Sequence, residues 1–212
     1  MKYLKLFEDF NDYDPYELMI IPPQKKAEMI VSEIKKKNKA NLNLVGDLIA
    51  LGADLDWQDN FGETVLHWCA SYNHSRIAKV LLDAGVDVNM RTEHGMTVLY
   101  LCARENRLEI ARMLLDAGTD VNIQDNDGIT ALHCGAVYNR PEIVRMLISA
   151  GADLNIQDED GRTALHWCER ENRLEIARML INAGADKTIP NNEGKLPYEL
   201  AKTQELKELL KP

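Results

Sequence analysis

Residues Asp125–Gln157 read DNDGITALHCGAVYNRPEIVRMLISAGADLNIQ, and almost every position of this stretch recurs elsewhere at a fixed offset. Two series of glycines each keep a step of 33 residues: Gly62, Gly95, Gly128, Gly161 and Gly194, and Gly52, Gly85, Gly118, Gly151 and Gly184. A period of that size predicts a stacked array, because one such unit cannot bury its own apolar face. The chain is therefore expected to form one elongated domain whose core grows lengthwise.

A motif that begins with threonine recurs at the same step. It reads TVLHWC at Thr64–Cys69, TVLYLC at Thr97–Cys102, TALHCG at Thr130–Gly135 and TALHWC at Thr163–Cys168. Each repeat ends in a Gly-Ala-Asp-x-Asn type of loop, as at Gly151–Asn155. On these motifs and the period of 33, the chain resembles the ankyrin-repeat family over roughly residues 24–212. The resemblance implies an all-α ankyrin-repeat solenoid, a right-stacked array with a helix–turn–helix and a hairpin-like loop per repeat and degenerate capping repeats at its ends.

The repeat register divides the chain into an arm, a first cap, four full repeats and a last cap. Pro22-Pro23 marks the first boundary, because a helix cannot run through two prolines. The predicted units are the N-terminal arm 1–23, the degenerate N-terminal capping repeat 24–58, the full repeats 59–91, 92–124, 125–157 and 158–190 (together 59–190), and the C-terminal capping repeat 191–212.

The arm mixes aromatic and acidic side chains and does not repeat. One interpretation is a segment that packs on the first repeat. The other is a docking peptide, as acidic-aromatic segments can be. The sequence leaves both open.

Inside each full repeat, the motif's threonine is expected to cap the first helix. An asparagine is expected to end that helix, because asparagine tolerates a left-handed backbone: Asn73, Asn106, Asn139 and Asn172. Trp68 and Trp167 are assigned to the core between helices. The sequence RENRLEIARML occurs at Arg104–Leu114 and again at Arg170–Leu180. Its two Glu/Arg pairs, spaced i, i+3, are predicted to form a solvated face; they are Glu109/Arg112 and Glu175/Arg178.

Composition excludes several classes of function. A formal charge of −9 argues against nucleic acid as partner, since such binding depends on lysine and arginine neutralising phosphates. No apolar run approaches the ~20 residues of a membrane span, and the first residues make a poor secretory signal. The four cysteines fall at repeat spacing, too far apart for disulfides, and indicate reduced core thiols. We therefore expect a soluble monomer in a reducing intracellular compartment, the cytoplasm first and the nucleus as the alternative.

No catalytic or metal-binding motif stands out, so neither an enzyme nor a cofactor is expected. His67, His133 and His166 share one repeat position, and the family resemblance implies that they hydrogen-bond loop backbone. His74 and His94 are assigned to a connection and a loop, as possible partner contacts. Aspartates that recur once per unit, such as Asp153, are expected to brace loops.

The family resemblance implies that loop tips and the exposed face of each first helix bind a partner in a concave groove. Carried over by position, the candidate partner-binding residues are Phe61, Glu63, Tyr72, Glu93, His94, Met96, Arg104, Glu105, Asp127, Ile129, Tyr138, Asp160, Arg162 and Arg170. Aromatic and apolar members of this set are the expected anchors, and its acids favour a basic contact surface. The predicted function is recognition of a protein or peptide without catalysis. The alternative is a decoy or inhibitor that acts through the arm together with the array.

Overall fold

The computed structural model describes residues 15–36, 40–169 and 173–212. In these ranges it contains helices and loops and no strand. The elements are α1 (Pro15–Ile20), α2 (Pro23–Lys35), α3 (Leu42–Ala50), α4 (Val65–Tyr72), α5 (Ser75–Asp83), α6 (Val98–Glu105), α7 (Leu108–Asp116), α8 (Ala131–Val137), α9 (Pro141–Ser149), the 3-10 helix η3 (His166–Glu169), α10 (Leu174–Asn182), α11 (Pro197–Leu200) and α12 (Gln204–Leu210).

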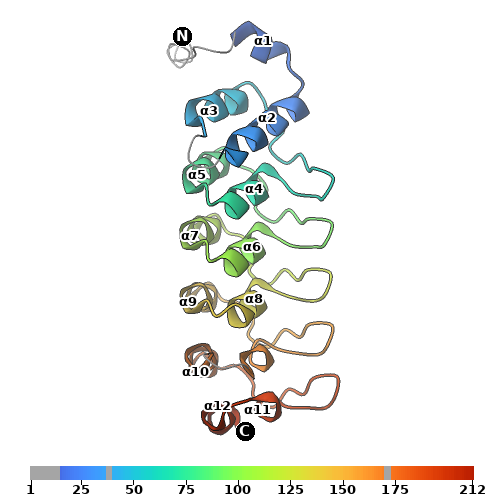
Figure 1. Ribbon diagram of the computed structural model, residues 1–212, viewed down its shortest axis with the longest axis vertical. Helices are drawn as coiled ribbons and strands as arrows, with labels where there is room; N and C mark the ends of the chain where they lie inside the picture. The colour runs from blue at the N-terminus through green and yellow to red at the C-terminus, as the bar shows by residue number, and fades with distance from the viewer. Residues whose placement is uncertain (1–14, 37–39, 170–172) are drawn as a thin grey trace.

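The helices stack as two parallel columns, and the long loops that join successive repeats project from the same side (Figure 1). The first helices α2, α4, α6 and α8 lie between the loops and the second helices α3, α5, α7 and α9. The all-α repeat solenoid predicted from the sequence is confirmed. Across the described residues, no helix combines the length and the apolar character that crossing a membrane would require.

The local signals act as predicted. The side chain of Thr64 accepts the backbone N–H of His67, and His67 Nδ1 accepts the N–H of Thr64 at 3.2 Å. This reciprocal cap recurs at Thr130 and His133. The asparagines that end α4 and α6 adopt left-handed backbone, with φ of 61° at Asn73 and 60° at Asn106. Asn172 lies outside the described residues.

The fourth full repeat departs from the pattern. In place of an α-helix, the described part of its first helix is the short 3-10 turn η3. Its last residue, Glu169, stands where Ala70, Ala103 and Ala136 are fully buried in the other repeats. A carboxylate without a partner is costly to bury. Glu169 is accordingly only half-buried, which fits a helix that does not follow the α-helical path here.

Neighbouring repeats are joined by regularly spaced hydrogen bonds between loops. The backbone N–H of Asp87 donates to Asp56 Oδ1 at 3.0 Å, and that of Asp153 donates to Asn122 Oδ1 at 2.8 Å, in each case across 31 residues. The carboxylate of Asp153 in turn accepts the N–H of Asn155. The recurring aspartates therefore brace loops, as expected.

The core runs the length of the array, and all four cysteines are free within it. Burial raises the pKa of Cys134 and of Cys168 to about 12. The four residues of the predicted i, i+3 pairs are exposed, which agrees with the predicted solvated face, but Glu175 and Arg178 find their partners outside their own helix. Glu175 instead pairs with Arg145 of the preceding repeat at 3.6 Å, and Arg178 with Glu205 of the last repeat at 3.3 Å.

Candidate functional site

The candidate site is the side of the array on which the loops and the first helices lie, here called the loop face. It consists of the loop tips 59–63, 92–96, 125–129 and 158–162 and the C-terminal ends of α4, α6 and α8. The predicted binding residues fall on these elements, except Arg170, which lies outside the described residues.

The predicted apolar anchors divide into two groups. Phe61 is 65% exposed and Tyr138 is 44% exposed. Tyr72, Met96 and Ile129 are partly buried and pack against the core. Among the predicted anchors, Phe61 and Tyr138 are thus the two that present large apolar surface which the fold itself leaves uncovered.

Phe61 is held in position by its own loop. Asp59 Oδ1 accepts the backbone N–H groups of Phe61 at 2.9 Å and Glu63 at 3.0 Å. The carbonyl of Phe61 accepts the N–H of Glu93 from the next loop at 3.0 Å. The backbone on both sides of the exposed ring is therefore ordered before any partner arrives, which lowers the entropic cost of binding.

Tyr138 is exposed because of its neighbour one helical turn earlier. At the equivalent position of α4, Tyr72 lies against Trp68, with ring centroids 5.9 Å apart. In α8 the residue four places before Tyr138 is Cys134, which is small and buried. Residues four apart share one face of a helix, so Tyr138 lacks the indole that covers Tyr72.

The two tryptophans correct the sequence analysis. Trp68 and Trp167 are half-buried on the loop face rather than core between helices. Each donates its indole N–H to a loop aspartate: Trp68 to Asp59 at 3.1 Å and Trp167 to Asp158 at 2.8 Å. The sequence carries no signal of this difference, because Leu101 and Cys134 occupy the same position in the other full repeats and both are apolar and buried.

A cationic side chain of the protein also lies over each of these two indole rings. The Lys35 ammonium lies 3.9 Å from the centroid of Trp68. The guanidinium carbon of Arg162 lies 5.1 Å from that of Trp167. Arg162, predicted as a partner contact, is thus half-buried over its own repeat's tryptophan.

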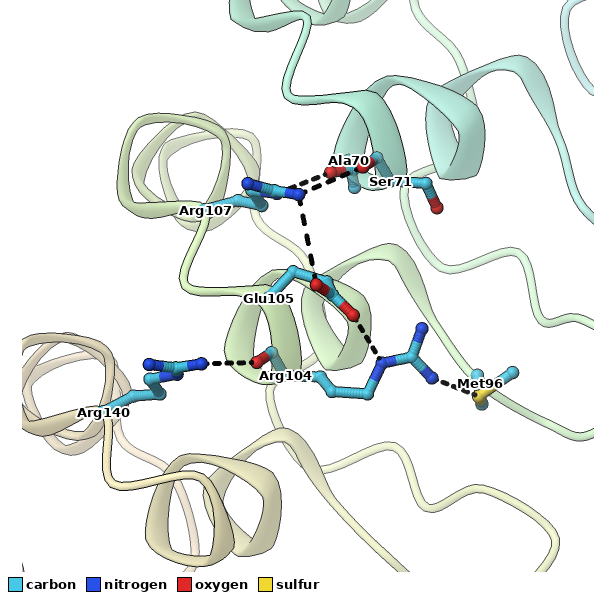
Figure 2. A network of polar contacts seen from close by, with 7 residues as sticks. All are labelled: Ala70, Ser71, Met96, Arg104, Glu105, Arg107 and Arg140. Atoms are coloured by element: carbon cyan, nitrogen blue, oxygen red, sulfur yellow. Dashed lines mark hydrogen bonds and ion pairs between the residues drawn. The ribbon is translucent and has the colours of Figure 1, made fainter. Parts of the chain in front are cut away.

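Arg104 and Glu105 join a polar network between repeats (Figure 2). Arg104 Nε donates to Glu105 Oε1 at 3.0 Å, and Arg104 Nη1 lies 3.9 Å from Met96 Sδ. Glu105 also lies 4.0 Å from Arg107, which binds backbone carbonyls of α4. These two predicted contacts are therefore partly engaged within the chain, and so is Met96.

The acidic members of the predicted set remain accessible. Glu93, Glu105, Asp127 and Asp160 are exposed, and Glu63 is half-buried. The predicted histidine, His94, is exposed as well. Burial, and then the neighbouring Asp59 carboxylate, raise the pKa of Glu63. A positive charge placed at this edge of the loop face would lower the repulsion between carboxylates.

The histidines of the repeated motif are engaged at both ring nitrogens. His67 Nδ1 contacts Thr64, and its Nε2 lies 3.2 Å from the carbonyl of Met96 in the next repeat. His133 and His166 make the same pair of contacts. Their role is structural, as the family resemblance implied. Within the described residues, no group of three or more His, Cys, Asp or Glu side chains is placed to hold a metal ion.

His74 is a further correction. It was expected at a connection open to a partner, but its Nε2 lies 2.8 Å from the carbonyl of Ile34, near the end of α2. Its ring therefore joins the first capping repeat to the first full repeat.

Comparison with known proteins agrees with this geometry. The family model described as ankyrin repeats (3 copies) matches residues 31–125 and again 117–191. Together the two matches run over well more than half of the chain. No curated protein matches the sequence significantly.

Proposed function

Because this chain belongs to the ankyrin-repeat family, whose members are generally protein–protein interaction modules and typically not enzymes, we propose that it binds a partner protein through the loop face without catalysis. The observation that carries the proposal is the pair of exposed aromatic side chains, Phe61 and Tyr138, on a face whose backbone is already ordered. Residues that dominate the affinity of an interface are typically aromatic, and binding costs less entropy where their backbone is already ordered.

The proposed partner presents a basic surface to this face. Glu93, Asp127 and Asp160 are exposed on the loop tips of the three repeats that follow the loop of Phe61, and the whole chain carries a formal charge of −9. Such a field accelerates association with a basic protein segment and disfavours an acidic one. It also disfavours nucleic acid, so the proposed complex is one chain of this protein with one basic protein or peptide.

The test uses the double variant Phe61→Ala/Tyr138→Ala. A partner captured from the source cell is identified, purified and titrated against wild type and variant by calorimetry. We expect the double variant to bind at least about tenfold more weakly, because truncating a central aromatic often costs ~2 kcal/mol. Its melting temperature should stay close to wild type, since both rings are exposed.

The matched control is Arg112→Ala, which changes an exposed residue of α7, away from the loops. It should leave affinity unchanged. Unchanged binding by the double variant at unchanged stability would contradict the proposal and direct attention to the arm.

The arm supports a second candidate function, that of a decoy or inhibitor acting through the N-terminus together with the array. Leu18 of α1 is buried, whereas Met19 and Ile20 are 61% and 83% exposed. The helix thus fixes one side chain and presents two others. Met19→Ser/Ile20→Ser should weaken partner binding only if the arm takes part in the interface.

A further inference from the structure

A hollow of about 340 Å³ opens at the N-terminal end of the loop face. It is lined by Glu28, Val31, Ser32, Lys35, Trp57 and Asp59. The first four residues belong to α2, and the last two belong to the loop that follows α3. The hollow thus lies between the capping repeat and the first loop, beside Trp68.

Two departures from the repeat pattern produce this hollow. Trp57 stands where the later repeats have Met90, Ile123, Ile156 and Ile189. When Ile30 is aligned with Leu66, Ser32 takes the position of Trp68. On the helix, the small hydroxyl of Ser32 therefore replaces an indole, which leaves space. On the loop, the indole of Trp57 replaces an aliphatic side chain, which gives that space an aromatic wall.

The adjoining indole already holds a positive charge from this chain. Lys35 is exposed, and its ammonium lies 3.9 Å from the centroid of Trp68. Trp68 cannot turn away easily, because its indole N–H donates to Asp59. The electron-rich face of a fixed indole attracts cations. Lys35 thus shows which kind of group this ring accepts, and its ammonium stands at the edge of the hollow.

Cations as well as carboxylates lie around the hollow: Lys35 and Arg104 both lower the pKa of Glu63, and Lys35 lines the hollow. Glu28 and Asp59 line it, and Glu63 lies close enough to Asp59 to have its pKa raised by that carboxylate. Glu28 has one cationic neighbour, Lys25, at 2.6 Å. That lysine side chain is 62% exposed, so the pair is solvated and can exchange partners at little cost.

We propose that this hollow binds an arginine side chain from a basic segment of the partner, with its guanidinium stacked between Trp57 and Trp68 and paired with Glu28. The proposal rests on the proposed function of the loop face and deepens it. On binding, the Lys35 ammonium leaves the Trp68 ring for solvent. Arginine fits better than lysine, because a planar guanidinium can stack on an indole and contact a carboxylate at the same time.

The test uses the full chain labelled with 5-fluorotryptophan, which gives one ¹⁹F resonance for each of its 3 tryptophans. Single substitutions Trp57→Phe, Trp68→Phe and Trp167→Phe assign them. The probe is a blocked hexa-arginine peptide, and the matched control is hexa-citrulline, which has the same shape without the charge. We expect hexa-arginine to shift the Trp57 and Trp68 resonances saturably and to leave the Trp167 resonance unchanged. Hexa-citrulline should shift none of the three.

Three variants sharpen the test. Lys35→Met removes the resident ammonium and keeps the stem, so hexa-arginine should bind roughly two- to fivefold more tightly. Trp57→Ile restores the residue of the later repeats and should remove the saturable shift at Trp68. Trp167→Leu restores the residue found at Leu101 and should leave hexa-arginine binding unchanged, although it removes the other tryptophan that carries a cation.

Other outcomes would overturn the proposal. Hexa-arginine binding without a shift at Trp57 and Trp68 would place the basic site elsewhere on the loop face; this proposal would then fail while the proposed function stood. A hexa-glutamate peptide that shifts both resonances and needs Lys35 would make the hollow an anion site. Weaker hexa-arginine binding by Lys35→Met would show that Lys35 assists and does not compete.

Discussion

Arg107 Nε donates a hydrogen bond to the carbonyl oxygen of Ala70 at 3.0 Å, across the boundary between two repeats (Figure 2). The carbonyl lies in the last turn of α4, where its one backbone donor within the described ranges is the N–H of the capping residue Asn73, at 3.3 Å. Equivalent residues act in the same way elsewhere: Arg140 Nη2 donates to the carbonyl of Arg104 at 3.3 Å, and Arg173 Nε to that of Ala136 at 2.8 Å. Each of α4, α6 and α8 is therefore capped at its C-terminus by an arginine from the following repeat, which also suits the helix dipole.

This contact predicts that Arg107→Met lowers stability. Methionine keeps much of the apolar stem but removes the donors to Ala70 and Ser71. Hydrogen bonds from charged groups contribute about 1.5–3 kcal/mol when buried, and the partial exposure of Arg107 reduces this, so we expect a loss of about 1–2 kcal/mol. Urea unfolding followed by circular dichroism measures it. Arg112→Met on the exposed side of α7 is the control and should change stability by less than about 0.5 kcal/mol; equal effects in both variants would contradict the capping role.

The buried motif histidines predict acid sensitivity. Burial lowers the pKa of His67 from 6.5 to about 4, and burial also lowers the pKa values of His133 and His166. The unfolded chain then binds more protons than the folded one between pH 6.5 and about 4, so stability is full above pH 6.5 and falls as pH drops through that window. For His67 this amounts to about 3 kcal/mol between pH 7 and pH 4.

The measurement is urea stability from pH 7.5 to 4.5 for wild type and His67→Asn. The variant is expected to be less stable at neutral pH, because both ring contacts are lost. Its stability should nevertheless depend less steeply on pH. If the free energy of unfolding depends on pH equally steeply in wild type and variant, His67 is not held neutral in the folded protein.

Two glycines with nearly equal backbone angles should respond differently to alanine. Gly128 has φ of 78° and Gly151 has φ of 83°. A Cβ added at Gly128 would lie 2.8 Å from Asp158 Cα and 2.9 Å from the backbone nitrogen of Glu159, whereas nothing lies within 4 Å at Gly151. Gly151→Ala should cost about 1 kcal/mol for the left-handed backbone alone. Gly128→Ala should cost about 1–3 kcal/mol more, because backbone atoms of the next loop must move. Thermal unfolding measures the stability of both variants. Equal losses of stability would mean that the loops are not packed as closely as the structure shows.

The arm offers a matched pair of apolar residues two positions apart on one short helix. Leu18 is 2% exposed and Ile20 is 83% exposed, although both lie on α1. Leu18→Ala should destabilise the array by about 2–3 kcal/mol, as for other buried leucines, and Ile20→Ala by less than about 0.5 kcal/mol. Unfolding midpoints of the two variants test whether α1 forms part of the N-terminal cap. A negligible effect of Leu18→Ala would leave the arm with a docking role alone.

Features carried by local sequence were predictable. The 33-residue step of the glycines, the Thr64–His67 cap and the left-handed asparagines Asn73 and Asn106 each depend on a few neighbouring residues that recur among the full repeats, with Tyr100 replacing the histidine in one of them. Repetition makes such signals strong, because an equivalent residue in each unit points to one shared backbone requirement. The fold class, the free buried cysteines and the loop-bracing aspartates followed from the same regularity.

Contacts between repeats could not be derived in this way, because they depend on which side chain stands one unit away. The cation over Trp68 is Lys35 of the preceding repeat, and Glu175 pairs with Arg145 of the preceding repeat rather than with Arg178 of its own helix. Stacking sets the distance between repeats, and the differences among repeats then determine which side chains the neighbouring unit covers. The sequence alone therefore establishes the scaffold, and packing between unlike neighbours establishes which residues of the loop face remain free to bind.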